Sequence, residues 1–194
     1  SENVTYTLYS DGRLVIQGTG SIEKGTWENS IKTKVKEISI DGNITTIGKM
    51  AFMSYSNLRS VNLGSITSID MAAFNGCSNL ETIQADSVTK IGSSVFNNCK
   101  KIKTISLRAL IDSKNIPITS SLESLTIGEK TDSKFTSNLV KASSLNALNI
   151  PEGNQYLKVD NSLLLSKNGT KLYYTLRNGE TNITIPDTVT SIEN

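Results

Sequence analysis

The chain has 194 residues, of which 37% are hydrophobic and 20% are charged, a mixture that suits one folded domain or one short repeat array. Its 20 basic and 18 acidic side chains are scattered along the chain, which excludes the concentrated positive charge of a typical nucleic-acid binder. There is no histidine, so the commonest general base, the commonest neutral metal ligand and every imidazole-activated nucleophile are excluded.

The first predicted element is a β-hairpin. Residues 4–17 alternate in character on either side of Asp11-Gly12, a dipeptide that favours a tight hairpin turn. Trp27 follows, and we expect it to pack on the first repeat. We interpret residues 1–34 as a β-hairpin cap on an array formed by residues 35–194, because the terminal faces of a repeat array need cover.

A repeat of 22 residues follows the cap. Phe52, Phe74 and Phe96 recur with this period, and two further apolar columns share it. One unit cannot bury its own apolar side, so stacked units are expected to form continuous buried rows. The two further columns are Ile47, Ile69 and Ile91, and Leu58, Leu80 and Ile102.

Each unit also contains a short predicted strand with two inward-facing residues. The alternation of apolar and polar residues favours strands whose neighbours lie about 4.8 Å apart. The units at about 102–144 lack the Ile-Gly-x-x-Ala-Phe turn and are interpreted as degenerate repeats. The predicted inward pairs are Ile38/Ile40, Val61/Leu63, Ile83/Ala85, Ile105/Leu107, Leu125/Ile127 and Leu148/Ile150.

A second hairpin is predicted near the C-terminus. Residues 163–165 and 171–174 flank Asn168-Gly169, again a tight-turn signal, and the hairpin insertion is placed at about 155–178. Residues 182–194 restart the strand-and-turn pattern and stop before the expected Ala-Phe. We expect a truncated last repeat there, and a sequence that is a piece of a longer array.

These elements predict a repeat solenoid that is mainly β with short helical or irregular turns. The segments 47–52, 77–80 and 185–192, with Cys99, resemble the BspA-like class of leucine-rich repeats. The stretches 12–20 and 156–174 also resemble segments common in that class. The resemblance implies a right-handed leucine-rich-repeat coil with a β-hairpin cap, in a bacterial cell-surface or secreted protein of the kind often called adhesins. It implies no shared catalytic or ligand motif.

Two pairs of repeated residues need an interpretation. Cys77 and Cys99 occupy the same position in adjacent repeats, where a disulfide or a two-ligand metal site is conceivable. Two thiols fall short of a tetrahedral metal site, and matching positions do not guarantee disulfide geometry, so buried free thiols are expected.

Gly48 and Gly92 form no phosphate-binding loop, and we expect each to occupy a turn that needs positive φ.

The outward side of the predicted strands is the candidate contact face. It is rich in hydroxyl and amide groups and contains no aromatic residue. Solubilising polarity is the simpler interpretation, and a weak or multivalent contact surface is the alternative. The candidate contact residues are Ser60, Asn62, Thr82, Gln84, Thr104, Ser106, Ser124 and Thr126, in columns that also include Glu37, Ser39, Ala147 and Asn149.

The sequence therefore favours a non-catalytic recognition or adhesion module that binds an extracellular protein or glycan of the host or of other microbes. The alternative is a structural spacer or stalk that presents another domain, and an enzyme is the third and least supported hypothesis. No catalytic residue, cofactor, metal site or nucleic-acid partner is expected. Membrane insertion is not expected either, because no stretch approaches the ~20 apolar residues that span a bilayer. A surface or secreted location is expected although the first residues do not form a signal peptide.

Overall fold

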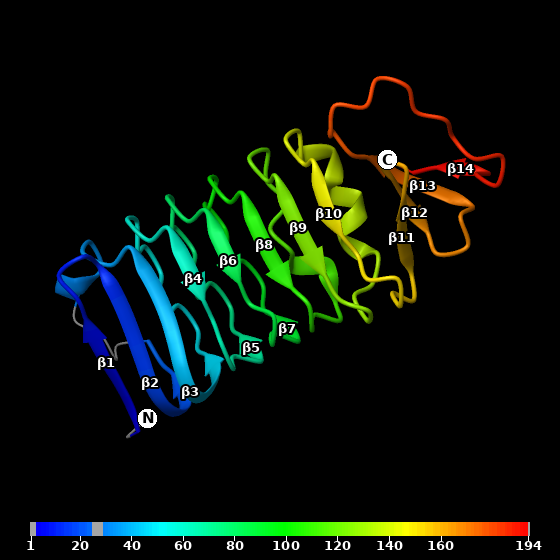
Figure 1. The fold of residues 1–194 in the computed structure, drawn as a ribbon. Coiled ribbons are helices and arrows are strands. Elements are labelled where there is room, and N and C mark those ends of the chain that lie inside the picture. The colour runs from blue at the N-terminus through cyan, green and yellow to red at the C-terminus, as the bar shows by residue number, and fades with distance from the viewer. Residues whose placement is uncertain (1–2, 25–28, 194) are drawn as a thin grey trace.

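A computed structural model describes residues 3–24 and 29–193, so the predicted packing of Trp27 lies outside the described residues. The chain winds into an elongated stack of coils in which successive strands lie side by side (Figure 1). This arrangement is a mainly β solenoid, as the repeat pattern predicts. Its strands are β1 (Val4–Leu8), β2 (Arg13–Ile22), β3 (Glu37–Ile47), β4 (Ser60–Asn62), β5 (Ser68–Ile69), β6 (Thr82–Gln84), β7 (Lys90–Ile91), β8 (Thr104–Leu107), β9 (Ser124–Ile127), β10 (Ala147–Asn149), β11 (Leu157–Asp160), β12 (Leu163–Ser166), β13 (Lys171–Thr175) and β14 (Ser191–Ile192).

One 10-stranded sheet contains most of the array, with β1, β2, β3, β4, β6, β8, β9 and β10 as successive neighbours. β1 and β2 form the antiparallel hairpin, and every later pair along this path is parallel. β2 also pairs with β3 from Arg13 opposite Glu37 to Ile22 opposite Ile47. It is therefore both the second strand of the hairpin and the first parallel strand of the array.

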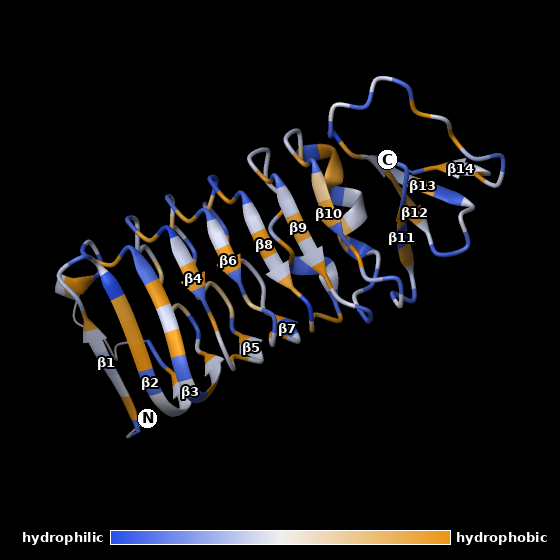
Figure 2. Ribbon diagram, in the orientation of Figure 1, coloured by the Kyte–Doolittle hydropathy of each residue, from blue (hydrophilic) through white to orange (hydrophobic). Residues whose placement is uncertain are grey.

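The core lies between the inward side of this sheet and the returning segments. The predicted inward residues of β3 to β10 are buried, except that Ile150 is half-buried at the edge of the core. In Figure 2 the inward residues appear as hydrophobic bands on strands whose other positions are pale or hydrophilic. Burial of one residue in two is the expected result of strand alternation.

Three phenylalanines form one file through the interior. The ring centroids of Phe52 and Phe74 lie 5.3 Å apart, and those of Phe74 and Phe96 lie 5.7 Å apart, with interplanar angles of 16° and 4°. All three side chains are buried, and Tyr55 contacts Phe52 edge-on at 5.5 Å. The predicted row of stacked rings is confirmed.

The expected role of the repeated glycines is wrong. Neither Gly48 nor Gly92 has positive φ; that conformation belongs to the non-glycine residues Met50, Ala72 and Ser94. Glycine is needed for close packing instead: a Cβ on Gly92 would lie 2.8 Å from the backbone nitrogen of Met71, and one on Gly48 would lie 2.9 Å from the carbonyl oxygen of Ile22. The preceding coil leaves no room for a side chain.

The degenerate repeats replace the missing phenylalanine turn with short 3-10 helices, which lie behind the sheet in Figure 1. These are η2 (Ser113–Asn115) and η3 (Lys134–Lys141), beside the short η1 (Asn29–Ile31) near the N-terminus. Phe135 in η3 is fully buried. Asp132 joins the two helices, because its carboxylate accepts hydrogen bonds from Ser113 N (3.0 Å) and Ser113 Oγ (2.5 Å) and contacts Lys134 Nζ at 2.9 Å.

The C-terminal strands form a separate 4-stranded sheet in the order β11-β12-β13-β14. β12 and β13 are antiparallel around Asn168-Gly169, and β14 adds in parallel to β13. This sheet is joined to the array by Leu164 and Leu176, which belong to the main core, and by a 2.6 Å hydrogen bond from Tyr174 Oη to the carbonyl of Ala142. Within the described ranges, no helix is long and apolar enough to cross a bilayer.

Candidate binding face on the parallel strands

The outward-facing residues of β3, β4, β6, β8, β9 and β10 lie in two straight columns, which we call the strand face. The parallel register places each residue opposite its counterpart in the next coil. Parallel pairing places residues at equivalent positions of successive repeats side by side, so a residue type that recurs in the sequence forms a row on the surface. The first column is Glu37, Ser60, Thr82, Thr104, Ser124 and Ala147, and the second is Ser39, Asn62, Gln84, Ser106, Thr126 and Asn149.

All eight predicted contact residues of the strand face are exposed or half-exposed. Some are held by neighbours: Ser106 Oγ donates to Asp86, and Thr126 Oγ1 accepts from Asn149 Nδ2 at 3.2 Å. Others, including Thr82 and Gln84, make no side-chain hydrogen bond to any part of the chain that the structure describes. Their donors and acceptors are available to a partner.

A shallow hollow of about 360 Å³ lies over the N-terminal half of the strand face. Four of the eight predicted residues line it, together with residues 13–15 of β2, residues 37–39 of β3 and Val61 of β4. Its size is at the lower end of ligand clefts, which are roughly 300–1,000 Å³. The four residues are Ser60, Asn62, Thr82 and Gln84, and the predicted residues of β8 and β9 lie outside the hollow.

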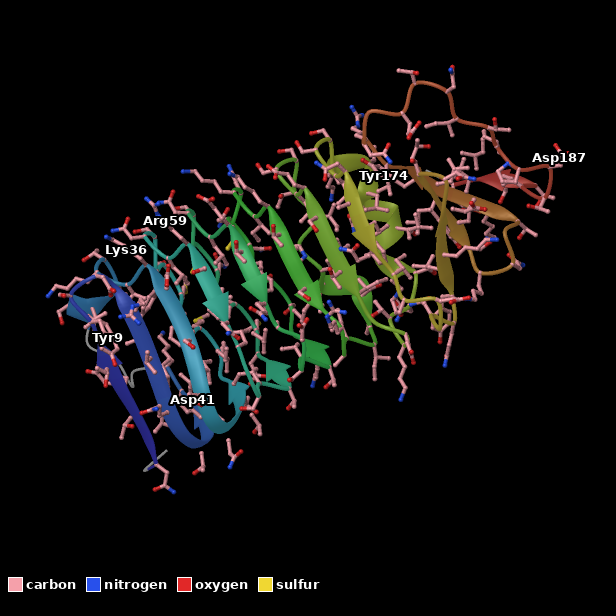
Figure 3. All side chains as sticks on the ribbon, viewed as in Figure 1. Tyr9, Lys36, Asp41, Arg59, Tyr174 and Asp187 are labelled. Atoms are coloured by element: carbon pink, nitrogen blue, oxygen red, sulfur yellow. The ribbon has the colours of Figure 1, made fainter. Side chains whose placement is uncertain are left out.

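A charged hollow of about 290 Å³ adjoins the first and shares Arg13 and Glu37 with it. Its other lining residues are Asp11 and, immediately before β3 and β4, Lys36 and Arg59. Figure 3 labels Lys36 and Arg59 at this edge of the sheet. Arg13 Nε donates to Asp11 at 2.8 Å, and this hydrogen bond lowers the pKa of Asp11 below its usual value. Lys36 and Arg59 make no ion pair with any described residue.

An aromatic residue also lies at this end. The Arg13 guanidinium stacks over the ring of Tyr9 at 4.7 Å, and the Tyr9 side chain is exposed. Tyr9 and Arg13 are missing from the predicted contact residues because residues 1–34 are interpreted as a cap only, and Arg59 is missing because it lies just outside the outward columns of the predicted strands. The alternation Arg13-Leu14-Val15-Ile16-Gln17 matches that of residues 37–41 and could have revealed β2 as a strand of the same face.

The two cysteines are buried and free, as expected. The Cys77 thiol donates to the carbonyl of Phe52 at 3.3 Å, and the Cys99 thiol donates to that of Phe74 at 3.2 Å. Contact with the Cys99 thiol and burial together raise the pKa of Cys77 above its usual range. A buried thiol of raised pKa is a poor nucleophile, so this position suits packing. No cluster of three or more potential metal ligands occurs among the described side chains.

Comparison with known proteins also indicates a leucine-rich repeat. The family model for the BspA type leucine-rich repeat region matches residues 20–145, in 6 copies. A leucine-rich repeat protein from Eubacterium ventriosum superposes with a TM-score of 0.67 at 24% identity, over 99% of this chain and 54% of that chain. The pneumococcal vaccine antigen PcpA superposes with a TM-score of 0.50 at 17% identity, over 99% and 59%. This chain thus spans little more than half of either protein. No curated protein sequence matches it.

Proposed function

Because this chain belongs to the BspA-type leucine-rich repeat family, we propose that it is a non-catalytic recognition module, displayed at the cell surface or secreted, that binds an extracellular protein or glycan through the strand face. One observation carries the proposal. Exposed hydroxyl and amide groups in register lead into a hollow beside Arg13 and Arg59. Groups of this kind satisfy the hydroxyls of a glycan or the backbone of a protein with equal ease.

The N-terminal end of the strand face is the proposed anchor. Binding energy in interfaces concentrates on a few residues, among which tyrosine and arginine are enriched. Arg13 and Arg59 line the charged hollow, and Tyr9 lies beside it in contact with Arg13. The hydroxyl columns farther along the array add weak contacts, and their repetition favours ligands that repeat as well.

A binding screen with matched variants tests the proposal. The purified chain is applied to a panel of immobilised glycans and extracellular-matrix proteins, and the strongest binder is carried forward. Gln84→Arg places a large side chain in the hollow and should weaken that binding about tenfold, the effect of losing roughly 1.4 kcal/mol. Ser78→Arg, an exposed change away from the strand face, is the control. Equal binding by both variants would refute the face assignment.

A structural spacer is the second candidate, and the elongated shape of the stack favours it (Figure 1). Deleting the array from the full-length protein separates the two functions. If the array recognises a ligand, adhesion of cells should fall when it is deleted. If ligand capture is unchanged, the spacer function is the remaining candidate. Assays of peptide and glycan hydrolysis test the non-catalytic part, and reproducible turnover by the purified chain would contradict it.

A further inference from the structure

In the turns that contain Phe52 and Phe74, which we call the phenylalanine turns, a ladder of backbone hydrogen bonds joins each coil to the next. The ladder ends at the turn that contains Phe96. In these turns every second backbone N–H donates to a carbonyl of the following coil. Met50, Phe52 and Ser54 donate to the coil that contains Phe74, at 2.8–3.1 Å. The next set repeats the pattern: Ala72 donates to Ser93, Phe74 to Val95, and Gly76 to Asn97, at 3.1, 3.1 and 2.8 Å.

The third set is left without partners. The corresponding N–H groups of Ser94, Phe96 and Asn98 donate to no described residue. The first and third of these residues nevertheless have nearly the same φ as their counterparts in the preceding coil, since Ser94 has φ of 57° where Ala72 has 58°, and Asn98 has 62° where Gly76 has 79°. Equal conformation directs these N–H groups as in the preceding coil, toward the segment that follows.

The following segment departs because it belongs to the first degenerate repeat. Residues 113–115 form η2, and Asn115 turns its side-chain amide back to the carbonyl of Ile91 at 2.9 Å. By the spacing of the earlier bonds, Phe52 to Ala73 and Phe74 to Val95, the carbonyl of Pro117 would accept from Phe96, but no hydrogen bond joins these two residues. Between the two segments lies a cavity of about 570 Å³, lined by residues 94–100, residues 114–120 and Lys141. It shares no residue with the hollows of the strand face.

The charge of this cavity has one sign. Lys100, Lys114 and Lys141 line it, and no aspartate or glutamate does. None of the three lysines forms an ion pair within the described ranges, although Lys141 Nζ donates to the amide oxygen of Asn138 at 2.9 Å. Two apolar side chains line it as well: Phe96, the last ring of the phenylalanine file, and Ile116 of the opposite segment, which are 7% and 5% exposed and form its apolar floor.

We propose that this cavity is a second binding site, which accepts an acidic polypeptide segment from a partner protein. Carbonyl oxygens of alternate residues in that segment accept from the N–H groups of Ser94, Phe96 and Asn98, as the carbonyls of the following coil do elsewhere in the ladder. Backbone groups left without partners are a recognised basis for such strand-like addition. An apolar side chain of the segment contacts Phe96, and its carboxylates lie near the three lysines.

A polypeptide fits these features better than a small anion. The three donors occupy every second position from Ser94 to Asn98, so one small anion cannot meet all of them, whereas an extended chain carries carbonyls at the same interval. The apolar floor has no role toward an inorganic anion. The lysines then select acidic over basic segments, because interface charges mainly determine partner choice.

The probe is a fluorescein-labelled, amidated peptide of sequence Glu-Glu-Phe-Glu-Glu, with Lys-Lys-Phe-Lys-Lys as its control. Fluorescence anisotropy should show saturable binding of the acidic peptide alone. The variant Lys100→Glu/Lys114→Glu should weaken this binding about tenfold or more, because two attractions become repulsions. Lys49→Glu, an exposed charge reversal elsewhere in the array, should leave it unchanged.

Amide NMR on the wild-type chain identifies the atoms involved. The signals of Ser94, Phe96 and Asn98 should shift on addition of the acidic peptide, and their hydrogen exchange should slow at least tenfold. Those of Ala72 and Phe74, already paired, should not change. Three results would overturn the proposal: protection of the three amides before any peptide is added, peptide binding that leaves them unshifted, or equal shifts with sodium sulfate or a sulfated disaccharide, which would indicate a general anion site.

Discussion

Replacing Phe74 with alanine should destabilise the array more than the same change at Phe96. Phe74 is fully buried and stacks on a ring on each side, at 5.3 and 5.7 Å, whereas Phe96 stacks on one side only and borders the 570 Å³ cavity. A buried Phe→Ala change costs about 3–5 kcal/mol. Each aromatic pair adds about 0.5–1.5 kcal/mol beyond burial. Phe74→Ala should therefore lie near 4–5 kcal/mol and Phe96→Ala near 3 kcal/mol.

Urea unfolding followed by circular dichroism measures both losses. Phe74→Leu is the matched control, because it retains an apolar side chain and removes the stacking, and it should cost about 1–2 kcal/mol. An exposed change on the strand face, Thr82→Ala, should stay within about 0.5 kcal/mol. Equal losses at Phe74 and Phe96, or a Phe74→Ala loss below about 2 kcal/mol, would refute a continuous file of stacked rings as a main element of the core.

Three further changes test individual contacts. The Tyr55 hydroxyl is buried without a partner among the described residues, so Tyr55→Phe should stabilise the chain by about 1 kcal/mol in thermal unfolding, and a loss of stability would reveal a hidden partner. Gly92→Ala should cost about 1–3 kcal/mol in urea, because its Cβ would overlap the preceding coil, and a neutral effect would contradict that contact. Burial raises the pKa of Asp132, but hydrogen bonds from Ser113 and Lys134 outweigh burial and hold it below 3.8. A carboxylate with a depressed pKa stabilises the fold fully above its unfolded-state pKa. The stability advantage of wild type over Asp132→Asn should therefore persist at neutral pH, begin to fall once the pH drops below the usual aspartate pKa, and disappear only below the still lower folded-state pKa; a gap independent of pH would refute it.

The candidate site was predicted in part. Two outward columns follow from strand alternation and the repeat, and those columns contain Thr82 and Gln84. Alternation does not show where a surface is hollow, because a hollow depends on the lengths of side chains in adjacent coils. The sequence therefore could not separate the four residues that line the hollow from Thr104 and Ser124. It also could not place Arg13 beside Glu37, since that contact depends on the register of β2.

The amino-acid sequence by itself determined the period, the inward pairs and the file of Phe52, Phe74 and Phe96. Each of these features depends on similar side chains that recur at equivalent positions of the repeat. Parallel stacking of the coils brings such side chains into contact. Only the tertiary structure decided why Gly92 must lack a side chain and where the ladder ends after Phe96. Both depend on how closely one backbone approaches the next. That distance depends on the path of the neighbouring segment: the coil before Gly92 lies against its backbone, whereas residues 113–115 turn into η2 and leave Ser94, Phe96 and Asn98 without hydrogen-bond acceptors among the described residues.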